Sequence, residues 1–77
     1  NWIDDSFDIL ADIRQRWGTV WNVWRSPSEI YHLKPNSEQP TIPKEVAEGL
    51  SRQLKNLYPM VSTAVYYGEG SQLSIRS

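Results

Sequence analysis

The sequence predicts an α+β domain: a long N-terminal amphipathic helix, then a strand, a second helix and two strands, with a small antiparallel-type sheet and the helices on one face. Three observations predict this class. Apolar residues recur at helical spacing in the first third of the chain, a narrower stripe follows Pro43, and β-branched and aromatic residues alternate after Pro59. We expect one small domain over residues 1–77. Such a domain buries only about 60% of its unfolded surface, which favours oligomerisation or a larger parent protein.

Residues 1–25 are predicted to form one long helix. Asn1, Asp5 or Ser6 can cap its start, and acidic residues near the start and arginines near the end complement the helix dipole. Its apolar stripe has a ridge of residues spaced seven apart, which are Ile3, Leu10, Trp17 and Trp24. Ile13 and Val20 occupy the complementary heptad positions, and four residues flank the ridge: Phe7, Trp21, Ile9 and Val23. The stripe covers roughly 160° of the helix surface, where ~100° suffices to dock on one core. We therefore expect this helix to have more than one partner.

Residues 26–42 are predicted to hold a strand and a proline-rich loop. Pro27 ends the first helix, and the apolar residues within 29–34 favour a strand. A short helix over the same residues is the alternative, because Ser26, with Pro27 next and Glu29 three residues on, also forms a capping-box pattern. The polar, proline-rich segment that follows is predicted to be a loop.

Residues 43–58 are predicted to form the second helix. Pro43 suits its first position and Tyr58-Pro59 its end. The apolar side chains form the narrow stripe of an ordinary surface helix: Val46, Ala47, Leu50, Leu54 and Leu57.

Residues 60–77 are predicted to form a β-hairpin. A three-residue loop, Gly68-Glu69-Gly70, pairs Val65 with Leu73 and Thr63 with Ile75, which matches apolar with apolar or β-branched residues. The last strand is a candidate edge strand, with Gln72, Ser74 and Arg76 on its outer face.

The helix, strand, strand order of residues 43–77 resembles half of a ferredoxin-like unit, of the kind found in ring-forming and inner-membrane components of secretion and pilus machines. The resemblance covers only these residues and rests on the order of elements, so it implies no functional residue.

Composition argues against several function classes. The chain has no cysteine and one histidine, so thiolate metal sites and histidine clusters are excluded and no cofactor is predicted. The formal net charge of −1 argues against nucleic acid as a partner. No apolar run reaches the ~18 residues that span a bilayer, so no transmembrane segment is predicted within this chain.

Two groups of residues resemble chemical sites, but the sequence favours a structural role for both. The acidic residues near the start of the first helix are expected to be a solvated helix start and not a metal site: Asp4, Asp5, Asp8 and Asp12. His32 could act as a general base beside Ser26, Ser28 or Glu29, but the sequence offers no orienting group or oxyanion site. We therefore expect a protein that is not an enzyme.

The sequence does not decide which role the aromatic residues have. Trp17, Trp21 and Trp24 fall within two helical turns and could form the core, a protein interface or a stacking platform, the last with nearby arginines as backbone contacts. Tyr66 and Tyr67 are consecutive on a strand and so point to opposite faces. An outward tyrosine could serve a docking surface or fill the space between strands.

The function that these observations favour is a non-enzymatic protein–protein interaction or assembly module, a fragment or subunit of a larger complex. Its partner would be another protein or a further copy of the chain, bound through the apolar face of the N-terminal helix. The predicted interface residues are Ile3, Phe7, Leu10, Ile13, Trp17, Val20, Trp21 and Trp24. The alternative is a module that stacks a sugar or nucleobase on Trp17, Trp21 and Trp24.

Overall fold

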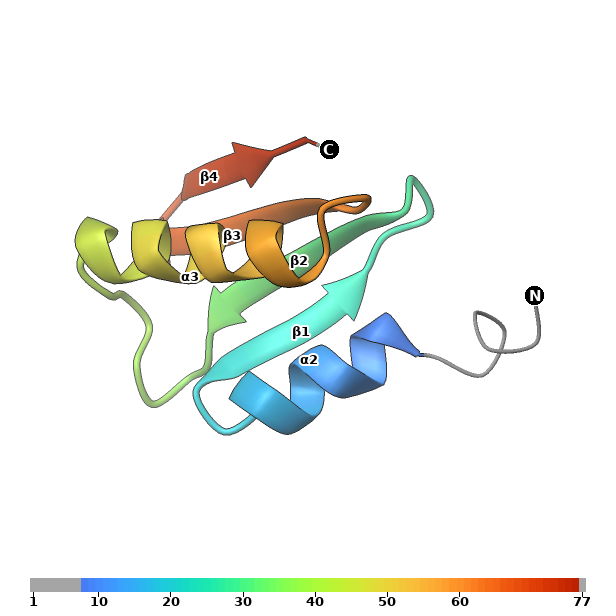
Figure 1. Ribbon diagram of the computed structural model, residues 1–77. Coiled ribbons are helices and arrows are strands. Elements are labelled where there is room, and N and C mark those ends of the chain that lie inside the picture. Colours follow the sequence, from blue (N-terminus) through green and yellow to red (C-terminus); the bar gives the residue numbers. More distant parts are fainter. Residues whose placement is uncertain (1–7, 77) are drawn as a thin grey trace.

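The computed structural model describes residues 8–76 and has two helices and a four-stranded mixed sheet (Figure 1). The elements are α2 (Ile9–Trp17), β1 (Trp21–Arg25), β2 (Ile30–Pro35), α3 (Lys44–Leu57), β3 (Ser62–Gly68) and β4 (Ser71–Ile75). The predicted α+β class is confirmed. The prediction was wrong in three respects: the first helix is short, the sheet has one strand more than expected, and it is mixed instead of antiparallel.

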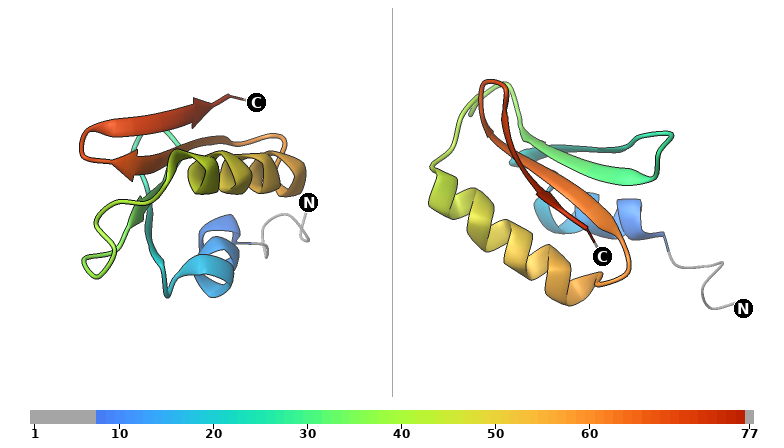
Figure 2. Two further views of the ribbon diagram at one scale, coloured as in Figure 1. Left: turned by 90° about the vertical axis from the view of Figure 1, so that its left-hand side faces the viewer. Right: turned by 90° about the horizontal axis from the view of Figure 1, so that it is seen from above.

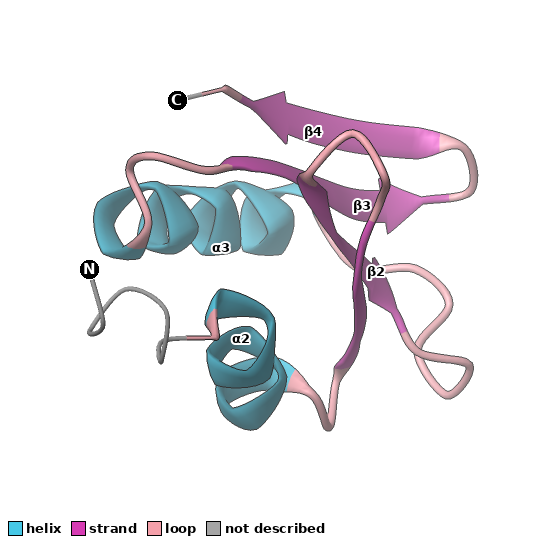
Figure 3. Ribbon diagram, turned by 90° about the vertical axis from the view of Figure 1, so that its right-hand side faces the viewer, coloured by secondary structure: helices cyan, strands magenta, loops and turns pink. Residues whose placement is uncertain are grey.

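The sheet consists of two hairpins joined by a helix. Its strand order is β1-β2-β3-β4, with antiparallel pairing inside each hairpin and parallel pairing between β2 and β3. A parallel pair needs a crossover connection, and α3 supplies it. Both helices lie on the same side of the sheet (Figures 2 and 3). Residues 8–76 therefore form two layers, and they leave one face of the sheet uncovered, which we call the open face.

The largest correction concerns residues 18–25, where the predicted long helix is replaced by a turn and strand β1. Gly18 ends α2, and a Cβ atom at this position would collide with the carbonyl oxygen of Arg14. The strand then alternates: Trp21 and Val23 are 5% and 8% exposed, whereas Asn22 and Trp24 point outward. The heptad ridge is consequently not formed, because its last member lies on a strand and faces away from the helix side.

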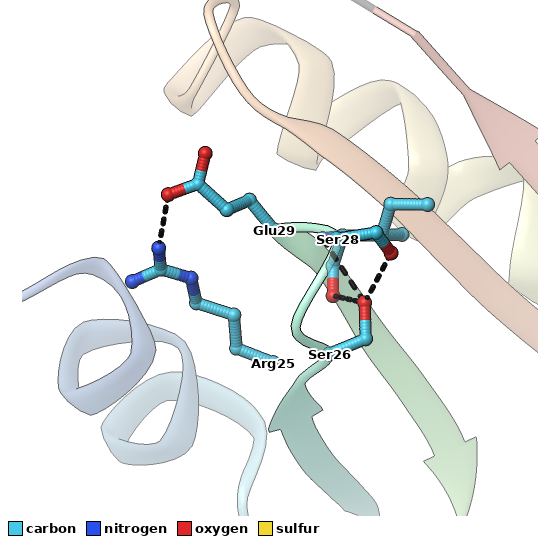
Figure 4. Close-up of polar contacts among 5 residues, drawn as sticks. Arg25, Ser26, Ser28 and Glu29 are labelled. Atoms are coloured by element: carbon cyan, nitrogen blue, oxygen red, sulfur yellow. Dashed lines mark hydrogen bonds and ion pairs between the residues drawn. The ribbon is translucent and has the colours of Figure 1, made fainter.

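A tight turn joins β1 to β2 (Figure 4). The N–H of Glu29 donates to the carbonyl of Ser26 at 2.9 Å, and Pro27 occupies the second position of this turn, which its fixed φ favours. Glu29 has a positive φ of 63° and forms an ion pair with Arg25. Pro27 thus ends a strand, not a helix, and the residues after it form a strand, not the alternative short helix.

The C-terminal half follows the sequence prediction closely. Helix α3 begins after Pro43, and the hairpin has the predicted pairs Thr63 with Ile75 and Val65 with Leu73. Gly68 pairs with Ser71, so the loop itself has two residues, and a β-bulge accounts for the extra residue. The predicted register is therefore confirmed, although the turn achieves it differently.

The core lies between the sheet and the two helices. Its fully buried side chains come from four elements: Ile13, Leu33, Leu54 and Val65. Two polar contacts fix α2: the Arg14 guanidinium donates to the Val23 carbonyl of β1 at 3.3 Å, and the Tyr58 hydroxyl, just after α3, donates to the Asp12 carboxylate. Neither described helix is long and apolar enough to cross a membrane.

Candidate functional site

The fold separates the residues predicted to form one interface. Ile13 and Trp21 are core residues, exposed by 0% and 5%, and Leu10 and Trp17 pack half-buried against them. Val20 and Trp24 remain exposed, each by 38%. Ile3 and Phe7 lie outside the described residues. No continuous apolar helix face therefore links these side chains in the described part of the chain.

The two described acidic residues of the first helix, Asp8 and Asp12, have hydrogen-bond partners within the fold. Asp8 caps α2 by accepting from the Ala11 N–H at 3.2 Å, and Asp12 accepts from Tyr58 and from Arg16. Asp4 and Asp5 lie outside the described residues. Within residues 8–76, no three histidine, aspartate or glutamate side chains are grouped so that they could hold a metal ion.

The three clustered tryptophans are separated in space as well. Trp17 ends α2, Trp21 enters the core from β1, and Trp24 lies on the opposite face of the same strand. The arginines considered as backbone contacts are also engaged elsewhere: Arg14 with the Val23 carbonyl, Arg16 with Asp12 and Arg25 with Glu29. The predicted stacking platform of three tryptophans is thus not assembled.

A different aromatic cluster forms on the open face of the sheet. The rings of Trp24 and His32 are stacked at 4.9 Å with an interplanar angle of 6°. Tyr66 lies 6.1 Å from Trp24 and 5.9 Å from His32, ring centre to ring centre. His32 Nδ1 is 3.1 Å from the Tyr66 hydroxyl oxygen, within hydrogen-bond distance. We call Trp24, His32 and Tyr66 the ring cluster.

The strand register explains why these rings meet. Trp24 pairs with His32, and His32 pairs with Ala64, so their side chains point to the same face of neighbouring strands. Tyr66 follows Ala64 by two residues and therefore shares that face. Each ring comes from a different strand, and the cluster exists only because β1 is a strand.

Among the described residues, no outward side chain of the four strands on the open face is a carboxylate. By strand alternation its outward residues are Asn22, Trp24, Ile30, His32, Lys34, Ser62, Ala64, Tyr66, Gln72 and Ser74. The acidic residues of the described chain lie instead on helices, turns and one loop: Asp8, Asp12, Glu29, Glu38, Glu45, Glu48 and Glu69. The described acidic residues therefore lie off the outward strand positions, although Glu69 lines a hollow together with Lys34.

A hollow of about 250 Å³ opens beside the ring cluster, at the end of the face where β4 finishes. Its polar lining residues are His32, Arg76, Gln72 and the hydroxyl-bearing Ser28, Ser62, Thr63 and Ser74, and none of the described acidic residues lines it. The side chains of these residues carry a guanidinium, an imidazole, an amide and hydroxyls, groups that can donate hydrogen bonds to an anion.

A second surface lies along strand β4, on the helix side of the sheet. Leu73 and Ile75 point toward the helices but remain half-exposed, and a groove of about 380 Å³ separates them from α3. Glu48, Arg52 and Lys55 line the α3 side of this groove. We call it the α3–β4 groove.

The two edges of the sheet are protected to different degrees. The edge strand β1 has α2 beside it and the Arg14 guanidinium on its backbone. Within the described residues, no side chain bonds to the backbone of Ser71–Ile75, and β4 pairs with β3 alone. An edge of this kind can pair with a further strand.

Sequence reasoning missed Tyr66 as a partner of His32 and missed the α3–β4 groove. The outward position of one of the two consecutive tyrosines was predictable from strand alternation, but its neighbours depend on the pairing of β1, β2 and β3. Comparison with protein-family models, with curated proteins and with solved structures finds no match to this chain.

Proposed function

We propose that this chain is a non-enzymatic interaction and assembly module that associates with a second copy of itself through strand β4 and the α3–β4 groove. The observation that carries the proposal is the half-exposure of Leu73 and Ile75 beside an unpaired strand edge. The proposed interface therefore lies at β4 and the α3–β4 groove, instead of on the apolar face of the N-terminal helix that the sequence favours.

A second copy fits this edge with a self-complementary register. Antiparallel pairing of two β4 strands about a two-fold axis at Ser74 places Leu73 of one copy opposite Ile75 of the other, twice. Both residues point to the helix side, so the four apolar side chains would form one patch that closes the two grooves. The product is an eight-stranded sheet with the helices of both copies on one face.

The charges along α3 are complementary under the same axis. Lys55 donates to the Arg76 carbonyl at 3.1 Å, so α3 and β4 end at the same side of the domain. Glu48 lies two turns earlier on the helix and lines the same groove. A two-fold axis reverses this order in the second copy, which brings Glu48 of one copy toward Lys55 of the other.

Sedimentation equilibrium over a wide range of protein concentrations tests the proposal. An interface of one strand and one helix from each copy is small, below about 1,200 Å², so we expect a dimer with a dissociation constant above about 1 μM. Ile75→Lys places a charge in the apolar patch and should raise that constant at least about tenfold. Met60→Lys is the matched control, because Met60 is 86% exposed and lies outside the groove.

A charge exchange makes the test specific for the register. Glu48→Lys and Lys55→Glu should each weaken the dimer, and the double variant should restore it, since every contact across the axis again joins opposite charges. A chain that stays monomeric at millimolar concentration, or a double variant as weak as the sum of the single ones, contradicts the proposal.

A further inference from the structure

We infer that the open face of the sheet binds single-stranded nucleic acid, with a base on the ring cluster and a backbone phosphate in the hollow that Arg76 lines. This inference concerns the face opposite the helices and does not depend on self-association.

The ring cluster offers a stacking surface of the required kind. His32 covers one face of the Trp24 ring in a nearly parallel stack, and 38% of the Trp24 surface remains exposed. Tyr66 and the Trp24–His32 stack hold each other in place through ring contacts and the contact between the Tyr66 hydroxyl and His32 Nδ1. A base can stack on such a preorganised indole without sequence preference, since every base has a π face.

The polar groups of the face favour an anionic ligand over a neutral sugar. Lys34 lies two residues along β2 from His32, and Arg76 lies at the end of β4, so a cation stands on each side of the ring cluster. The outward side chains of all four strands include no carboxylate to repel a phosphate or to accept hydrogen bonds from sugar hydroxyls. The acidic residues within 8–76 belong to helices, turns and a loop, so among these residues none of the negative charge is carried by an outward residue of a strand.

The spacing favours a strand over a free nucleotide. Trp24 belongs to the first strand of the sheet and Arg76 follows the fourth, so the two are separated by three interstrand spacings across the sheet, about 14 Å, and by two further residues along β4. A base stacked on Trp24 can place its own phosphate at the His32 end of the hollow, but that end lies two interstrand spacings from the strand that Arg76 follows. A chain of two or more nucleotides can place a base on the ring cluster and a neighbouring phosphate beside Arg76.

The test is fluorescence anisotropy of a labelled eight-nucleotide pyrimidine strand titrated with the full chain at 50 mM salt. We expect saturable binding that Trp24→Ala weakens about tenfold, as loss of one base stack implies, and that Trp24→Phe largely retains. With two phosphate contacts, affinity should fall about sevenfold between 50 and 200 mM salt.

Arg76→Gln should weaken binding and halve the dependence on salt, whereas Arg52→Gln, which removes an exposed arginine from the helix side, should change neither. Circular dichroism confirms that each variant is folded. Absence of binding at low salt, binding that survives Trp24→Ala, or a mononucleotide that binds as tightly as the strand would each overturn the inference.

Discussion

The face of the sheet that packs on the helices and the face that stays open are built from the same four strands, yet their side chains are held very differently. On the covered face, Leu33 and Val65 are fully buried and reach both helices through one core. On the open face, Trp24, His32 and Tyr66 are supported by one another and retain exposed surface. The buried apolar core thus lies on the helix side, so we expect substitutions on the open face to cost less stability than substitutions on the covered face.

The largest effect that separates the two faces is expected for two tryptophans three residues apart on β1. Trp21→Ala removes a ring that is 95% buried in the core and should lower the free energy of unfolding by about 3–5 kcal/mol. Trp24→Ala removes mainly ring stacking and should cost about 1 kcal/mol. Urea unfolding followed by circular dichroism measures both losses. Equal losses would show that the open face contributes as much to stability as the covered face.

The next largest effect is expected for the contact that joins the two helices. The hydrogen bond from Tyr58 to Asp12 joins the end of α3 to α2, so Tyr58→Phe and Asp12→Ala should each destabilise the domain by about 1–2 kcal/mol. A double-mutant cycle should give a coupling energy near 1 kcal/mol. Arg16→Ala serves as the control, because its ion pair with Asp12 is exposed and should contribute about 0.5 kcal/mol or less. Additive losses from the first two variants would mean that the contact between Tyr58 and Asp12 does not stabilise the position of α2.

The smallest effect has the opposite sign and lies in the turn between β1 and β2. Glu29 has a φ of 63°, a conformation that glycine adopts without strain. Glu29→Gly should therefore stabilise the domain by about 0.5–1 kcal/mol despite the loss of an exposed ion pair with Arg25. Glu29→Ala loses the ion pair and keeps the strain, so thermal unfolding should show no gain for this variant.

The halves of the chain differ in how well the sequence predicts them. In the C-terminal half, each element carries its own local signal: Pro43 opens a helix with a narrow stripe, and two glycines mark a turn between alternating runs. In the N-terminal half, Trp17, Trp21 and Trp24 fit the spacing of a helix, while Trp21 and Val23 also fit the alternation of a strand. Gly18 and the pairing with β2 favour the strand. Because that pairing is a tertiary contact, the local sequence pattern alone does not predict it.

The candidate site was predictable only in part. Trp24 was singled out from the sequence, and Tyr66 was recognised as one of two tyrosines of which one must face outward. Trp24 and Tyr66 meet at His32 because three strands lie in the order β1-β2-β3. No local sequence pattern specifies that order. The hollow beside Arg76 and the α3–β4 groove depend in the same way on which strand ends the sheet.

The parallel seam between β2 and β3 has a consequence for how the chain folds. Each hairpin joins residues that are close in sequence, whereas the seam brings Ile30–Leu33 beside Ser62–Val65 across the whole length of α3. Closing that long loop costs entropy before any seam contact forms, so we expect docking of the two hairpins to limit the rate of folding. A chain cut in the loop after β2 should accordingly reassemble from two fragments, at a rate governed by their encounter.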